Sequence, residues 1–298
     1  MSARHRGEAR FSWLGGLGYG LVLTVILLIW RFPADTAERY LERRIATVLP
    51  GVVVEPGTCS YGFPFRLLVD TVRIVRQNGG EEIALVENAS VVPVLTGFGR
   101  TYTMQGQVYG GTLTATMTWA PLAGALRVDA IELSRVALDR SPLLVSGSGR
   151  QLRGFLDFSG RGLIALAPSL QSDVQGTVTI DRGGLPLRQR ILSLTQIEVD
   201  QLRFGLVCDG GVVRVSDGIL QGPALRADFA GEVRPAGPFE AWSLQVHGNM
   251  ALQPTFASGN PRGLRMLRQL QKQFRQDDLP FQLDGDIGNP RFRFGRDQ

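Results

Sequence analysis

The chain has 298 residues, of which 44% are apolar, so it can bury a core of its own. Its 37 glycines and 16 prolines indicate many turns and exclude a body built from long helices. The net charge of +5 is carried by arginines and one lysine, Lys272. These charges are spread along the chain and do not form the stripe that would bind nucleic acid.

An uncharged apolar run extends from Trp13 to Trp30 and, as a helix, would span about 27 Å, close to the hydrocarbon thickness of a bilayer. A cleaved signal peptide is the alternative, but its apolar region is shorter and ends in a small-x-small site, whereas the sequence here continues through Ala34-Asp35-Thr36-Ala37. We therefore expect a retained single-pass anchor at residues 13–31. Because arginines lie in residues 1–12, this tail is expected in the cytoplasm. The remaining chain would then lie across the membrane, in the periplasm if the cell is a Gram-negative bacterium.

A short amphipathic helix is predicted directly after the anchor, within residues 32–50. Apolar residues recur at helical spacing between Asp35 and Leu49, and Pro50-Gly51 ends the pattern. This segment is expected to join the membrane to the body. Packing on the first strands is the alternative, and the sequence does not separate the two.

A second amphipathic helix is predicted from Asn260-Pro261, which suit a helix cap and first turn, to Gln276. Its apolar stripe consists of Leu264, Leu267, Leu270 and Phe274, and its basic residues are Arg262, Arg265, Arg268, Lys272 and Arg275. The helix could lie on an anionic membrane, or its stripe could cover a sheet end while its charges are solvated. Its position inside the body favours the second reading.

Between the helices the sequence alternates with a period of two. Threonines at 112, 114, 116 and 118 face one way, and the residues between them face the other. Residues 225–234 and 244–250 alternate similarly. Turn dipeptides at Asn78-Gly79, Gly110-Gly111, Asp209-Gly210 and Asp217-Gly218 favour tight hairpins. We therefore predict a mainly β body over residues 51–298, formed by a long, curved, mostly antiparallel sheet.

The predicted sheet has one apolar face, which must either fill a closed core or hold an apolar ligand. Most such sheets fill their own core, so that reading is favoured. The residues that would line a core or a groove are Leu113, Ala115, Met117, Trp119, Phe229, Val246 and Met250.

Signatures of catalysis are lacking in the sequence. His5 and His247 are the only histidines, so neither a histidine-rich metal site nor a catalytic triad can be assembled. The acidic pairs Asp277-Asp278 and Asp284/Asp286 fit solvated loops or strands, and no glycine-rich phosphate loop is found. We therefore expect no enzyme activity, cofactor or metal.

Cys59 and Cys208 are the only cysteines. In an oxidising periplasm they could form a disulfide, or both could remain free thiols, because geometry rather than number decides pairing. The sequence leaves both alternatives open.

After the anchor and short helix, Tyr109-Gly110-Gly111-Thr112-Leu113 resembles the opening of AsmA-like repeat proteins. Further similarity lies in residues 202–207, 209–218, 220–233 and 283–292. In order and length, nearly the whole chain after residue 10 resembles the type II secretion system protein N family. The similarity consists of turn-and-strand patterns rather than chemical signatures.

This resemblance implies an inner-membrane-anchored periplasmic accessory that assists assembly, or bridges inner-membrane components to the outer-membrane secretin, for export of folded proteins. Bridging would use unpaired strand edges, and the strands around Val52–Val54 and Phe292–Phe294 are the candidates. The AsmA-like resemblance implies an alternative, in which an apolar β-groove carries phospholipid acyl chains between membranes. Neither role involves nucleic acid.

Overall fold

The computed structural model describes residues 52–62, 65–76, 80, 82–94, 100–120, 125–142, 152–165, 173–236 and 241–295. The predicted cytoplasmic tail, anchor and juxtamembrane helix, residues 1–12, 13–31 and 32–50, lie outside the described residues. None of the helices within the described ranges is both long and apolar enough to cross a membrane.

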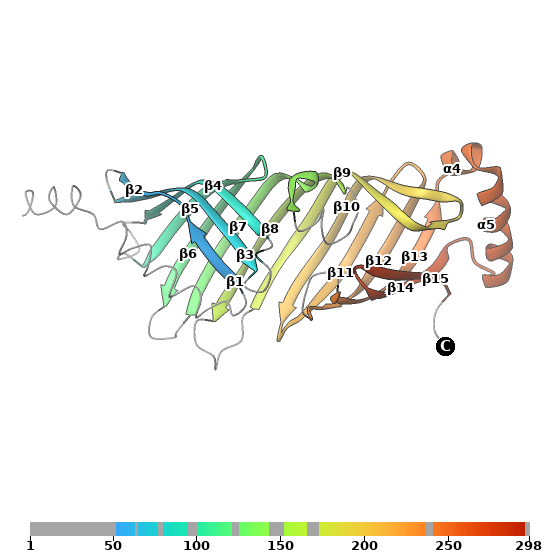
Figure 1. The fold of residues 1–298 in the computed structure, drawn as a ribbon. Helices are drawn as coiled ribbons and strands as arrows, with labels where there is room; N and C mark the ends of the chain where they lie inside the picture. The colour runs from blue at the N-terminus through green and yellow to red at the C-terminus, as the bar shows by residue number, and fades with distance from the viewer. Residues whose placement is uncertain are drawn as a thin grey trace, which may run out of the picture.

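Fifteen strands of the described residues form a single antiparallel sheet (Figure 1). They are β1 (Val52–Pro56), β2 (Cys59–Gly62), β3 (Arg66–Arg76), β4 (Glu82–Pro93), β5 (Thr101–Val108), β6 (Gly111–Ala120), β7 (Ala125–Ala137), β8 (Arg153–Ala165), β9 (Asp173–Ile191), β10 (Leu194–Asp209), β11 (Val212–Gln221), β12 (Leu225–Arg234), β13 (Ser243–Leu252), β14 (Leu279–Asp286) and β15 (Asn289–Phe294). From β3 onward every strand pairs with the next along the chain, while β1 and β2 both pair with β3. The predicted mainly β, antiparallel meander is confirmed.

The sheet is long and curved, with β1 toward one end and β14 and β15 at the other (Figure 1). Neighbouring strands lie about 4.8 Å apart, so fourteen strands in a row extend about 60 Å. Within the described chain, β1 and β15 are the two end strands of the pairing order. These are the strands that the sequence analysis named as candidate edges.

Tight turns follow the glycine pattern closely. The β5–β6 turn has positive φ at Tyr109 (47°) and Gly110 (80°), and the β10–β11 turn at Gly210 (58°) and Gly211 (80°). The first turn thus lies one residue before the predicted Gly110-Gly111, and the second lies one residue after the predicted Asp209-Gly210. Asn78-Gly79 lies outside the described residues.

The prediction of a hairpin turn at Asp217-Gly218 is wrong. Both residues lie inside β11, where the pairing with β12 shifts between Val215 and Gly218 and Asp217 has a φ of 51°. The backbone conformation that suits Asp-Gly to a turn also suits a β-bulge, in which one extra residue increases the local twist. Asn88 in β4 and Arg135 in β7 have positive φ at similar register shifts.

The β9–β10 hairpin extends past its neighbours as a two-stranded ribbon. The pairing of β8 with β9 ends at Gly184, whereas β9 continues to pair with β10 as far as Ile191. The tip, Leu192-Ser193, has two positive φ angles, 51° and 71°, and the Leu192 side chain is buried. The ribbon reaches the helices at the β15 end of the sheet (Figure 1).

Two helices, α4 (Pro254–Gly259) and α5 (Pro261–Phe274), cover this end. The Asn260 side chain accepts a hydrogen bond from the Gly263 N–H (2.9 Å) and donates one to the Leu192 carbonyl (3.0 Å). The apolar stripe of α5 packs against strand residues of the C-terminal core. The predicted helix and the prediction that it covers a sheet end are confirmed, whereas α4 was not predicted.

The described residues form two separate apolar clusters. The N-terminal core consists of Val69, Val86, Ala89, Val108, Leu113 and Val136. The C-terminal core consists of Leu192, Leu225, Ala227, Met250, Phe256, Leu267, Leu279 and Phe281. A continuous sheet therefore connects two distinct packing centres.

Candidate functional site: an apolar face across the whole sheet

The seven residues predicted to line a core or groove lie on one face of the sheet. Leu113, Ala115, Met117 and Trp119 alternate along β6. On the other half, Phe229 pairs with Gly248, and Val246 and Met250 flank Gly248 two residues away on β13. The pairing register joins these two groups through the strands between them.

One line of residues makes this connection without interruption. It runs across the strands from β2 to β15, and we call it the central row. Its members are Tyr61, Leu67, Val91, Met104, Ala115, Ile131, Gly160, Gly176, Leu206, Val215, Gly231, Val246, Leu283 and Phe292. Apart from the Tyr61 hydroxyl, these side chains carry no polar group. The central row therefore forms an apolar band about 60 Å long.

The opposite face is polar at the neighbouring register positions. Next to the central row, the cross-strand series is Gln105, Thr114, Glu132, Ser159 and Thr177. Because successive side chains of a strand point to opposite faces, the sheet separates an apolar from a polar side along its length. The prediction from the threonine series at 112–118 is confirmed.

Burial varies from residue to residue along the apolar face. Leu113 and Met250 belong to the two cores, and Ala115 is buried. Met117, Trp119 and Val246 are half-buried, as is every member of the central row except Ala115. The apolar face therefore contains a packed core toward each end, and the central row is half-buried along its whole length except at Ala115.

Glycines and phenylalanines shape the middle of this face. A Cβ added at Gly160 would lie 2.6 Å from Phe158 Cζ, and one at Gly176 would lie 2.5 Å from Phe158 Cε2. A Cβ at Gly218 would lie 2.5 Å from Phe229 Cε2. Each ring thus lies low over a glycine of its own or a neighbouring strand. The rings thus cover positions on the apolar face that have no side chain of their own. The sequence did not predict these contacts, because the residues meet only through the pairing register of neighbouring strands.

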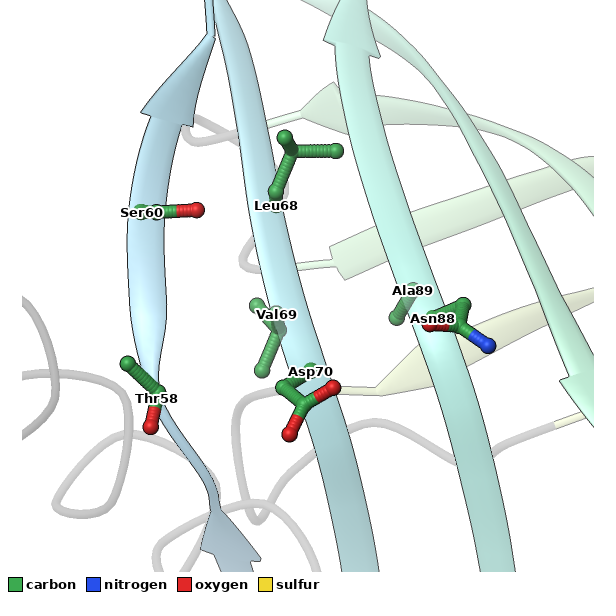
Figure 2. A pocket seen from close by; sticks show the side chains of 7 residues that line it. All are labelled: Thr58, Ser60, Leu68, Val69, Asp70, Asn88 and Ala89. Carbon is green, nitrogen blue, oxygen red and sulfur yellow. The ribbon is translucent and has the colours of Figure 1, made fainter.

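Three open hollows on the described surface are lined by both polar and apolar residues. One lies over β2, β3 and β4 and is lined by Thr58, Ser60, Leu68, Val69, Asp70, Asn88 and Ala89 (Figure 2). Asn88 is the residue with positive φ at the β4 bulge. Two further hollows lie over β7 to β11 and include Ser159 and Thr177.

The acidic and histidine residues considered for catalysis are dispersed. His247 is exposed on the polar side of β13, and Asp277-Asp278 is exposed after α5. Asp284 forms an ion pair with Arg293 on β15. Over the residues that the structure describes, no group of three or more histidine, cysteine, aspartate or glutamate side chains could hold a metal ion.

One tyrosine is electrostatically unusual. Burial, followed by the nearby Glu82 carboxylate, raises the pKa of Tyr109 to about 12. The Tyr109 hydroxyl donates a hydrogen bond to Glu82 Oε1 (3.4 Å), and the Tyr109 carbonyl accepts one from the Ala137 N–H (3.3 Å). These contacts connect the β5–β6 turn to β4 and β7. The raised pKa of Tyr109 therefore follows from its packing in the sheet.

Cys59 and Cys208 do not form a disulfide in the structure. Cys59 is on β2 and Cys208 on β10, and the strand order places β3 to β9 between them. A disulfide requires the two Cα atoms to lie within about 7 Å. Burial, together with the charges of Asp173 and Asp209, raises the pKa of the Cys208 thiol.

The chain has no match among family models, curated proteins or solved structures. The distinguishing features of the sheet are its continuous apolar face and its two end strands, β1 and β15.

Proposed function

We propose that the chain is an inner-membrane-anchored periplasmic accessory of the type II secretion machinery. In this role it assists assembly, or bridges inner-membrane components to the outer-membrane secretin, during export of folded proteins, without catalysis, cofactor or metal. The observation that carries the proposal is the open sheet, whose end strands β1 and β15 are separated by about 60 Å of continuous pairing. A stiff body with a pairing edge at each end can hold two partners at a fixed separation. The resemblance to the type II secretion system protein N family supports the same role.

The backbone at both ends is arranged for pairing with a further strand. On β15, the Gly295 N–H donates to the Pro280 carbonyl (2.9 Å), and the alternation of an antiparallel ladder then turns the backbone groups of Phe292 and Phe294 away from β14. On β1, the Gly57 N–H donates to the Thr71 carbonyl (2.7 Å), so the Val54 N–H points away from β3. Outward backbone donors and acceptors are what strand addition requires.

The first test is deletion of the chain from its host. We expect folded exoproteins to accumulate in the periplasm while a periplasmic marker stays inside the cell. Unchanged secretion, accompanied by a leaky or detergent-sensitive outer membrane, would contradict the secretion role and favour lipid transport.

A second test addresses the edge directly. Val54→Pro removes the outward N–H of β1 but leaves the inward hydrogen bonds to β3, so thermal stability should change little while secretion falls. Val54→Thr keeps the N–H and suits a strand, and it serves as the matched control. If both variants secrete like the wild type, β1 is not the bridging edge.

A second candidate function is supported by the central row. Its half-buried apolar side chains form a band longer than the roughly 30 Å hydrocarbon core of a bilayer, so it could hold phospholipid acyl chains. In this role the protein would bind and transfer lipid for outer-membrane biogenesis.

Paired lysine substitutions separate the two candidates. Leu206 belongs to the central row, whereas its neighbour Val207 is exposed on the opposite face, so Leu206→Lys places a charge on the apolar face and Val207→Lys does not. If the face carries lipid, phospholipid extracted from the purified wild type should be lost in Leu206→Lys and retained in Val207→Lys. Wild-type protein purified without phospholipid would exclude this second function.

A further inference from the structure

The exposed side of α5 carries an uninterrupted group of positive charges. Arg262, Arg265, Arg268, Lys272 and Arg275 are all exposed, and we call them the basic face. The helix contains no acidic residue and is about 21 Å long. Like charges three and four residues apart repel each other on a helix, so this arrangement opposes rather than assists helix stability.

The basic face differs from the rest of the described surface. On the sheet, arginines alternate with carboxylates and pair with them, as in Arg73–Glu82 (3.3 Å), Arg127–Asp129 (2.7 Å) and Arg234–Glu232 (3.2 Å). None of the five basic residues of α5 forms an ion pair with an acidic residue in the described part of the chain. Their charges therefore remain available to an anionic partner.

The fold holds this face in a fixed orientation. Leu267 is buried in the C-terminal core, and a Cβ added at Gly263 would lie 2.5 Å from the Leu192 carbonyl oxygen, so α5 sits directly on the tip of the β9–β10 ribbon. Asn260 fastens the first turn to the same carbonyl. Because the apolar stripe is already occupied, α5 can bind only through its exposed side and cannot insert that stripe into a bilayer.

The composition of the exposed side fits lipid headgroups better than a protein. Tight protein interfaces centre on aromatic anchors and exclude lysine, but this side carries no aromatic residue. Besides the cations it offers neutral Gln269 and Gln273, and the Met266 side chain, which is 51% exposed. A line of cations beside one exposed apolar side chain is typical of contact with an anionic membrane surface.

We propose that the basic face of α5 binds the surface of an anionic phospholipid bilayer by electrostatic contact with headgroup phosphates. This contact lies at the β15 end of the sheet, away from β1, where the described chain begins (Figure 1). It is independent of the secretion and lipid-transfer roles proposed above, since it uses neither strand edge nor the central row.

The test uses the full chain with a single fluorophore on α5. Gln269→Cys, in a Cys59→Ser/Cys208→Ser background, provides the labelling position. Energy transfer to a headgroup-labelled lipid is measured in phosphatidylcholine vesicles with and without about 30% phosphatidylglycerol. The N-terminal segment carries arginines of its own but is identical in the wild type and in every variant, so a phosphatidylglycerol-dependent signal that is lost on substitution in α5 reports on α5.

A neutralised variant and a matched control decide the outcome. Arg262→Gln, Arg265→Gln, Arg268→Gln and Lys272→Gln together should weaken the phosphatidylglycerol-dependent signal by about 100-fold in apparent affinity, and salt should weaken the wild-type signal. The control combines Arg127→Gln, Arg203→Gln, Arg226→Gln and Arg234→Gln on the sheet, which remove the same net charge and should leave the signal unchanged. Circular dichroism checks that both variants are folded.

Two results would overturn the proposal. The first is equal loss of signal in both variants, which would make net charge rather than α5 the cause. The second is absence of any phosphatidylglycerol-dependent signal in the wild type, in which case an acidic protein surface becomes the better partner for these charges.

Discussion

At the residue scale, the contacts between phenylalanine rings and glycines determine the shape of the apolar face. Phe158 lies over both Gly160 and Gly176, and the Gly176 position is also confined by the Ser159 carbonyl, 2.7 Å from an added Cβ. A methyl group cannot enter this space without moving backbone or ring. The glycines on this face are therefore packing residues, even though they contribute no side chain.

Gly176→Ala should lower the free energy of unfolding by about 1–3 kcal/mol, because the new methyl group overlaps Phe158 and the Ser159 carbonyl. Gly184→Ala is the matched control on the same strand, since its Cβ would meet only Arg153 Cβ at 3.8 Å. We expect the control to be neutral or slightly stabilising. Urea unfolding of the two variants measures the difference, and equal stabilities would show that the ring moves aside at no cost.

The Cys208 thiol should react slowly with alkylating agents. Burial and the carboxylates of Asp173 and Asp209 raise its pKa, so at pH 8 a smaller fraction is thiolate than in the unfolded chain. In a Cys59→Ser background, the alkylation rate should rise in urea. It should also rise with pH at a higher midpoint than for an ordinary thiol. Asp209→Asn removes one of the two charges and should shift that midpoint downward, so an unchanged midpoint would leave burial and Asp173 as the causes.

At the scale of the elements, Asn260 connects α5 to the β9–β10 ribbon through both atoms of its amide. Its oxygen caps the helix at Gly263, and its nitrogen bonds the carbonyl of Leu192, a residue with a left-handed backbone. The cap holds the helix, while the second bond holds a strained hairpin tip against it. One side chain thus couples the two structures that close the β15 end.

Asn260→Ala should destabilise the protein by about 1–2 kcal/mol, since the cap and the bond to Leu192 are lost together. Asn260→Asp keeps the acceptor for the Gly263 N–H but loses the amide donor, so we expect its stability to lie between those of Asn260→Ala and the wild type. Thermal unfolding monitored by circular dichroism provides the comparison. An Asp variant as unstable as the Ala variant would assign the whole effect to the Leu192 contact.

Several elements could be predicted from the sequence because their signals are local. The threonine series at 112–118 predicts a one-sided strand, and Asn260-Pro261 predicts the start of α5; the structure contains both. The Asp217-Gly218 signal was misread because a bulge and a hairpin turn require the same backbone conformation. The short helix α4 has only a proline at its first position as a sequence signal.

The candidate site could be predicted only in part. Alternation placed Met117 and Val246 on apolar faces of their own strands, but nothing in either segment showed that the two faces are the same one. That relation depends on the pairing register of every strand between them, which is a nonlocal property. For the same reason, Phe158 and Gly176 could not be recognised as contacts, because they lie on different strands and meet only across the ladder.

At the scale of the whole molecule, the two cores lie at different ends of one sheet and share no residue. Each strand contacts its sequence neighbours, so the body is organised like a one-dimensional array of adjacent units. In such an array, a substitution that unfolds one end does not have to unfold the other.

Leu279→Ala should cost about 2–5 kcal/mol locally, because this side chain is fully buried in the C-terminal core. Hydrogen exchange should then accelerate in β12–β15 and α5, while protection in β3–β6 remains as in the wild type. Leu113→Ala, in the N-terminal core, should give the reverse pattern. Faster exchange over the entire sheet in either variant would show that the body unfolds as one cooperative unit.

The absence of closure in the pairing order of the described strands has a consequence for how such a protein can change over evolution. A barrel fixes its strand number, tilt and stagger together, so one added hairpin disturbs every other strand. An open meander, in which the two end strands do not pair with each other, carries no such condition. Inserting a hairpin between β8 and β9 would lengthen the body by about 10 Å while leaving both cores and the contact of the β9–β10 ribbon with α5 intact. The reach of the molecule can thus be adjusted in steps, independently of the surfaces at its ends.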